Sequence, residues 1–154
     1  MIASLTNYLN SNAVRRFLDR FGIWLVIALA GFLRLWQLGY PSKLVFDETY
    51  YVKDAWTLWN TGSEKAWPQD ANLAFEAGQV SGYLSDPSFV VHPPLGKWII
   101  GFGMWLFGAE NSYSWRISTA LLGIAAVGIL FLIAKQLFKL SLIHISEPTR
   151  LRRI

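Results

Sequence analysis

An unbroken apolar run from Phe21 to Leu33 is the feature that most limits what this chain can fold into, because all thirteen positions are apolar or glycine. Arg34 and the six residues LWQLGY extend the segment to 21–40, which supplies about the twenty positions that a helix needs to cross a bilayer. Hydrophobic residues make up 53% of the 154 residues, a share that does not describe a soluble surface. We therefore expect an all-α membrane protein whose first transmembrane helix is 21–40.

Basic residues just before this run predict its orientation. They are Arg15, Arg16 and Arg20. By the positive-inside rule they keep residues 1–20 in the cytoplasm and place residue 41 on the outer face. A signal peptide is the alternative, but its small-residue cleavage site would have to be Ala28 and Ala30, in the middle of the apolar run.

Two later apolar stretches predict further spans. The second, 94–109, has sixteen residues and is short for a hydrocarbon core of about 30 Å. Pro93 and Pro94 are suited to start its helix, because a first-turn proline lacks only an amide that has no helical partner there. The third, 117–134, has eighteen residues. We therefore expect about three transmembrane helices. Two lysines after the third span would then lie on the outer face, against the positive-inside rule; they are Lys135 and Lys139.

Residues 41–93, between the first two spans, form a long polar loop. It holds three lysines, no arginine and seven acids, which are Asp47, Glu48, Asp54, Glu64, Asp70, Glu76 and Asp86. An acidic loop without arginine suits the outer face of a cell membrane. A connection of this length is usually functional or disordered, and its many aromatic residues argue against disorder.

The C-terminal residues are excluded from the fold. LSLIHISEPTR, residues 140–150, resembles the in-frame translation of a sequencing adapter, so we expect 140–154 to be an artefact and the reading frame to be interrupted. Without 141–154 the chain keeps 11 basic and 9 acidic residues, and the net charge falls from +4 to +2. A charge this small gives no reason to expect a nucleic-acid partner.

A pair of adjacent carboxylates in FDETYY, residues 46–51, is the sharpest local feature of the outer loop. One interpretation is a helix cap, with Asp47 at the N-cap, Glu48 at the positive end of the helix dipole, and Phe46 packed on Tyr51 as a hydrophobic staple. The helix would run from Glu48 to about Trp59 and lie in the membrane interface. The other interpretation is catalytic, and the two are compatible because a cap can fix a carboxylate in position.

Three motifs in order resemble the start of a protein O-mannosyltransferase, a membrane glycosyltransferase of the GT-C class, in its actinobacterial form. They are FDETYY in the outer loop, VVHPPLGKW at the head of the second span and WRISTALLG at the head of the third. The resemblance covers about residues 30–134. It implies that the chain is the N-terminal fragment of a longer multi-span fold, and we expect the isolated fragment to be inactive.

The resemblance implies transfer of mannose from a polyprenyl-phosphate-mannose donor to Ser or Thr hydroxyls of secreted proteins on the outer face. An alcohol is a poor nucleophile until its proton is removed, so a positioned carboxylate is the sensible base. Asp47 is the candidate base, and Glu48 would orient the acceptor or tune Asp47. Membrane lipid and the protein-export machinery are the other expected partners.

The departing lipid phosphate needs a cation, and three compete for that role. Arg34 lies late in the first span, where a charge is either functional or snorkels to the headgroups. Lys97 could meet the phosphate or be an ordinary interfacial lysine. Arg116 matches the family's arginine, but two full spans would place it on the cytoplasmic side, which favours a structural role.

Other residues of the motifs have less specific expectations. His92 could hydrogen-bond the donor or the acceptor, or merely cap the helix that Pro93 and Pro94 start. Tyr51 is a candidate substrate-binding residue beside the carboxylate pair. We expect no cofactor and no metal site, because one usable histidine and scattered acids lack ligand spacing. The absence of cysteine also excludes a disulfide scaffold and thiolate metal ligands.

Two other functions remain open. GT-C enzymes that move sugars from the same kind of lipid carrier to lipid A or a glycan share an acidic loop and a Pro-Pro motif. His92 and the Trp115-Arg116 pair favour the protein-directed branch. The second alternative is a small non-catalytic membrane adaptor, in which Asp47 is only a helix cap.

Overall fold

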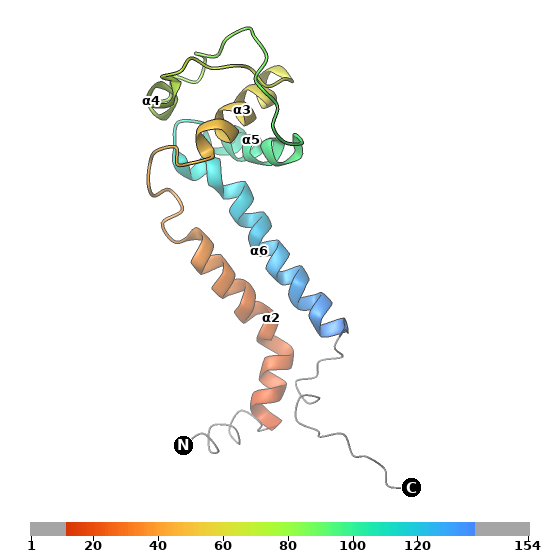
Figure 1. Ribbon diagram of the computed structural model, residues 1–154. Helices are drawn as coiled ribbons and strands as arrows, with labels where there is room; N and C mark the ends of the chain where they lie inside the picture. The colour runs from red at the N-terminus through yellow and green to blue at the C-terminus, as the bar shows by residue number, and fades with distance from the viewer. Residues whose placement is uncertain (1–11, 138–154) are drawn as a thin grey trace. The chain divides into compact units, whose positions relative to one another are not determined.

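The computed structural model describes residues 12–137, and every regular element within them is a helix (Figure 1). In chain order these are α2 (Asn12–Leu35), α3 (Glu48–Thr61), α4 (Ala71–Glu76), α5 (Leu95–Phe107) and α6 (Ser112–Leu137). The expected all-α class is confirmed. The segment 140–154, which we expect to be an artefact, lies outside the described residues.

The described residues divide into two compact units, one made of residues 34–123 and the other of 12–33 with 124–137. In the second unit, α2 and α6 approach each other at small residues. A Cβ added at Gly22 would lie 3.6 Å from the Phe131 ring, and one at Gly128 would lie 3.4 Å from Ile27. Large apolar side chains on both helices are exposed, including Trp24 at 65% and Leu130 at 66%. Exposed apolar faces of this kind suit lipid or further helices.

Within the described residues, only α6 is both long enough and apolar enough to cross a membrane, judged by length and composition alone. It begins five residues before the predicted span 117–134 and extends three residues past it. Helix α2 carries Asp19 and Arg20 in its first half and Arg34 in its last turn. It covers 12–35 instead of 21–40, because residues 36–39 form a turn.

In the unit 34–123, α3 and α5 lie side by side (Figure 1). The buried core around them includes Val52 and Ala55 of α3, Phe75 of α4, Met104 of α5 and Trp115 of α6. Helix α3 ends at Gly62, whose φ of 75° is left-handed and whose amide bonds to the carbonyl of Leu58. Glycine adopts that conformation at little cost, so the sequence ends the helix there.

Helix α5 does not separate the acidic motif from Arg116. Its thirteen residues are about 20 Å long, which is less than the core of a bilayer. The Nε of Arg116, in α6, donates a hydrogen bond of 2.6 Å to Glu48 at the start of α3. Groups on opposite faces of a membrane would lie about 30 Å apart. Arg116 therefore lies beside the acidic motif, and not two full spans away from it as the sequence predicted.

Candidate functional site

Asp47 lies at the N-terminal end of α3, and among the described residues its carboxylate makes no hydrogen bond or ion pair. It occupies the N-cap position, as predicted, but its side chain makes no capping hydrogen bond. Phe46 before it has a φ of 53° and is 86% exposed, so it does not form the predicted staple. A left-handed non-glycine residue costs about 1–3 kcal/mol and is typical of functional sites. The backbone therefore turns sharply where it presents Asp47.

Glu48 is fixed, in contrast to its neighbour. Its carboxylate accepts the amide of Val45 at 3.0 Å and two guanidinium donors of Arg116 at 2.6 and 2.7 Å. Arg116 also donates to three backbone carbonyls of the preceding loop, those of Leu38, Pro41 and Lys43. A bidentate arginine holds a carboxylate in one orientation. Of the two adjacent acids, Asp47 is thus the one available to a substrate.

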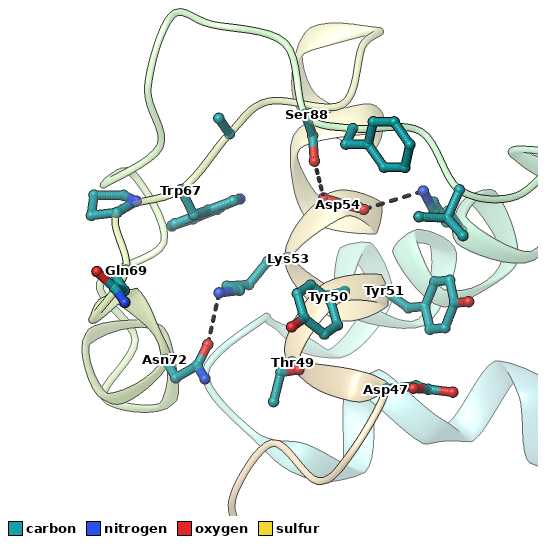
Figure 2. Close-up of a pocket in the computed structure, with 15 residues that line it drawn as sticks. Asp47, Thr49, Tyr50, Tyr51, Lys53, Asp54, Trp67, Gln69, Asn72 and Ser88 are labelled. Atoms are coloured by element: carbon teal, nitrogen blue, oxygen red, sulfur yellow. Dashed lines mark hydrogen bonds and ion pairs between the residues drawn. The ribbon is translucent and has the colours of Figure 1, made fainter.

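A cavity of about 830 Å³ opens beside the first two turns of α3 (Figure 2). Asp47, Tyr50 and Tyr51 line it from the helix start, and Lys53 lines it one turn further on. The opposite wall comes from the loop after α3, from the start of α4 and from residues 88–91. Its size suits a sugar or a short peptide segment.

The rear of the cavity holds a buried charge cluster. The ammonium of Lys97 contacts Asp54 at 3.2 Å and also contacts Glu64, and its side chain is 3% exposed. Ser88 donates its hydroxyl to the other oxygen of Asp54 at 3.1 Å. Two carboxylates therefore surround one lysine, and these contacts connect α3 and α5 to the intervening loop. Lys97 lines the cavity, but two carboxylates already contact the ammonium that was predicted to meet a phosphate.

Lys53 is a second buried lysine, and sequence reasoning missed it. Its Nζ donates to the side-chain oxygen of Asn72 at 2.7 Å and lies 6.0 Å from the centre of the Trp67 ring. Burial lowers the pKa of Lys53, and the nearby charge of Asp54 only partly opposes this. The sequence did indicate that Lys53 lies six residues after Asp47 and on the helix that follows it. Nothing in the sequence placed Trp67 or Asn72 beside it.

The remaining predicted residues are dispersed. The ring of the exposed His92 lies 5.7 Å from that of Tyr51, next to the cavity. Pro94 is the N-cap residue of α5, so the predicted helix start is confirmed, without a side-chain cap from His92. Arg34 does not line the cavity, and its side chain lies against Gly123 of α6.

Among residues 12–137, no group of three His, Asp or Glu side chains is placed to hold a metal ion.

Comparison with known proteins places these residues in a family context. Residues 91–144 match the family described as dolichyl-phosphate-mannose-protein mannosyltransferase. A polyprenol-phosphate-mannose–protein mannosyltransferase of Mycolicibacterium smegmatis is 34% identical over 134 residues, which are 82% of this chain and 22% of that protein. The Mycobacterium tuberculosis protein of that name is 31% identical over 133 residues, with the same coverage.

More distant relatives carry names of the same kind. Protein O-mannosyl-transferase 1 of mouse is 29% identical over 94 residues, 59% of this chain and 10% of the mouse protein. No solved structure matches the chain. The chain spans about 22% of the length of the mycobacterial relatives. The resemblance that the three motifs predicted is confirmed at the level of the family.

Proposed function

We propose, from the premise that this chain belongs with the protein O-mannosyltransferases, that residues 12–137 form the acceptor-activating part of a membrane mannosyltransferase. The donor is a polyprenyl-phosphate-mannose and the acceptor is a Ser or Thr hydroxyl of a secreted protein. The names of the mycobacterial relatives give polyprenol-phosphate-mannose as the donor and a protein as the acceptor. The activity belongs to the longer protein of which this chain resembles a part.

Asp47 acts as the general base in this proposal. It takes the proton of the acceptor hydroxyl while the hydroxyl oxygen bonds to the anomeric carbon of mannose. The bond from that carbon to the phosphate oxygen breaks, and the lipid phosphate leaves with the electron pair. A base positioned in this way contributes about 10²- to 10⁴-fold in rate. The observation that carries the proposal is the free Asp47 carboxylate at the cavity beside a Glu48 that Arg116 holds.

The other predicted residues take supporting roles. In this proposal Tyr51, which lines the cavity, and His92, whose ring lies 5.7 Å from that of Tyr51, contact the sugar or the acceptor. Lys97 is structural, because two carboxylates already neutralise it. Arg34 remains the candidate cation for the lipid phosphate, since it lies in the last turn of α2 at the outer end of the predicted span.

The localisation follows from the same assignment. We place the protein in the cell membrane with residues 1–20 in the cytoplasm and the cavity on the outer face. Helix α5 lies on the membrane surface instead of crossing it. Its side toward α3 holds buried Gly101, and Trp98 and Trp105 contact the Trp59 ring of α3 on this side while remaining 38% and 61% exposed. Tryptophan is enriched at membrane interfaces, where its apolar ring contacts lipid while its indole N–H reaches water.

The decisive experiment introduces Asp47→Asn into the full-length protein that contains these residues. Membranes with Asp47→Asn should transfer mannose to a Ser/Thr peptide at least 100-fold more slowly, with little change in donor KM. The matched control is Asp86→Asn, which removes an exposed carboxylate of the same loop that does not line the cavity. Undiminished transfer by Asp47→Asn would refute the assignment. Transfer to lipid A or a glycan, but not to peptide, would favour the other GT-C branch.

A further inference from the structure

The two buried lysines of the outer loop differ in their partners. Lys97 contacts two carboxylates, whereas the ammonium of Lys53, in the described part of the chain, donates its one hydrogen bond to the neutral side-chain amide of Asn72. Asp54 is adjacent to Lys53 in sequence, but its two oxygens already accept from Ser88 and Lys97. A buried cation is costly unless an anion contacts it. Among the described residues, no carboxylate contacts the ammonium of Lys53, although Asp54 lies close enough for its charge to act on it.

The wall around Lys53 offers hydrogen-bond donors. The indole nitrogen of Trp67 is buried and, among the described residues, has no hydrogen-bond partner. Asn72 uses its side-chain oxygen on Lys53, which leaves its amide nitrogen as a donor. Figure 2 shows Lys53, Trp67 and Asn72 together at one side of the cavity. A sugar would need acceptors as well as donors here, whereas a carboxylate needs donors only.

The direction of Lys53 indicates where its ligand comes from. Helix α5 packs against α3 at Ala55 and Trp59, which lie 3.1 and 3.2 Å from where a Cβ on Gly101 would stand. At 100° per residue, Lys53 lies about 160° around α3 from Ala55. It therefore faces away from the apolar helix, toward the aqueous side. A water-borne ligand is favoured over a lipid headgroup.

The distance between Asp47 and Lys53 along α3 determines how many peptide residues separate the accepting hydroxyl from a ligand bound at Lys53. Six helical positions span about 9 Å, and an extended peptide covers about 3.3 Å per residue. We propose that Lys53, with Trp67 and Asn72, binds the carboxylate of an Asp or Glu in the acceptor polypeptide, two or three residues from the hydroxyl that receives the sugar. This inference rests on the proposed function and adds an acceptor preference to it.

The test compares eight peptides that each contain one Thr, with either Glu or Gln placed two or three residues before or after it. In the genomic-length protein, one Glu peptide should show a KM about tenfold below its Gln counterpart at similar kcat. Lys53→Met should abolish this difference, and Trp67→Phe, which removes only the indole N–H, should reduce it. Lys65→Met is the control, because Lys65 bonds to the carbonyl of Ser85 outside the cavity. Equal KM values, or a preference that survives Lys53→Met, would overturn the inference.

A second measurement needs no transfer activity, so it separates this inference from the proposed function. Reductive methylation of the unsubstituted protein, followed by mass spectrometry, reports the reactivity of each lysine. The preferred Glu peptide should slow methylation of Lys53 at least threefold and leave Lys65 unchanged, while the Gln peptide should protect neither. Failure of the Glu peptide to protect Lys53 would overturn the inference even if mannose transfer is observed. Protection without any transfer would support the site and count against the enzymatic role.

Discussion

At the residue scale, two adjacent carboxylates have different roles because one arginine holds only one of them. Glu48 is fixed by the guanidinium fork of Arg116, which also donates to three loop carbonyls. Asp47 has no such partner among the described residues, and its backbone is presented by a left-handed Phe46. The position of the proposed base therefore depends on an arginine far away in the sequence.

We predict that Arg116→Lys lowers kcat for mannose transfer by roughly 10- to 100-fold, since a lysine cannot reproduce the bidentate contact and a small displacement of a base is costly. Donor KM should change little. The measurement is steady-state transfer in membranes that contain equal amounts of each protein. Glu48→Gln should lower kcat by a similar factor, because both substitutions retain the Asp47 carboxylate but weaken the Glu48–Arg116 contact that fixes its position. Full activity in Arg116→Lys would contradict the positioning role.

Lys53→Met is predicted to stabilise the unit 34–123 at neutral pH by a few degrees in Tm, although it removes a charge. The pKa of Lys53 is lowered by burial, so the unfolded chain binds this proton more tightly than the folded one. Stability should therefore rise with pH between the lowered pKa and the ordinary lysine value. This rise should be absent from Lys53→Met. Thermal unfolding in detergent at several pH values measures it, and identical pH profiles of the two proteins would contradict the prediction.

At the element scale, local chemistry explains which parts of the fold could be predicted. The polar pair before α3 and the prolines before α5 are signals within their own segments, and both helices begin within a residue or two of the predicted positions, although Asp47 makes no capping hydrogen bond. Contacts between distant segments could not be predicted in this way. The pairing of Glu48 with Arg116 joins residues 68 positions apart, and the pairing of Lys53 with Asn72 joins α3 to α4.

The close packing of α5 gives a prediction at this scale. A Cβ on Gly103 would collide with the carbonyl of Ser114 and lie 2.7 Å from the hydroxyl of Ser118, both in α6. Gly103→Ala should therefore destabilise this unit by roughly 1–3 kcal/mol. Gly96→Ala, on the same helix, meets nothing within 4 Å and should be neutral or stabilising by up to ~1 kcal/mol. Chemical denaturation of both variants in detergent tests the contrast, and equal stability of the two would contradict this packing.

At the scale of the whole molecule, the proposed position of α5 on the outer surface would resolve the charge conflict that the sequence alone raised. If three spans crossed the membrane, Lys135 would lie outside. With α5 on the surface, α6 returns the chain to the side where α2 begins. Lys135 in the last turn of α6 then lies on the cytoplasmic side with Arg16 and Arg20 of α2. The positive-inside rule is satisfied at both ends.

Single cysteines can test this topology, since the chain has none of its own. We predict that Glu110→Cys, between α5 and α6, reacts with an impermeant maleimide in intact cells as fast as Ser85→Cys in the outer loop. Asp19→Cys should react only after permeabilisation. Residues 19, 85 and 110 are all exposed, so the comparison measures sidedness and not burial. Protection of Glu110→Cys in intact cells would mean that α5 does cross the membrane. Arg116 would then lie on the far side from Asp47, and the bond that holds Glu48 could not form in the membrane.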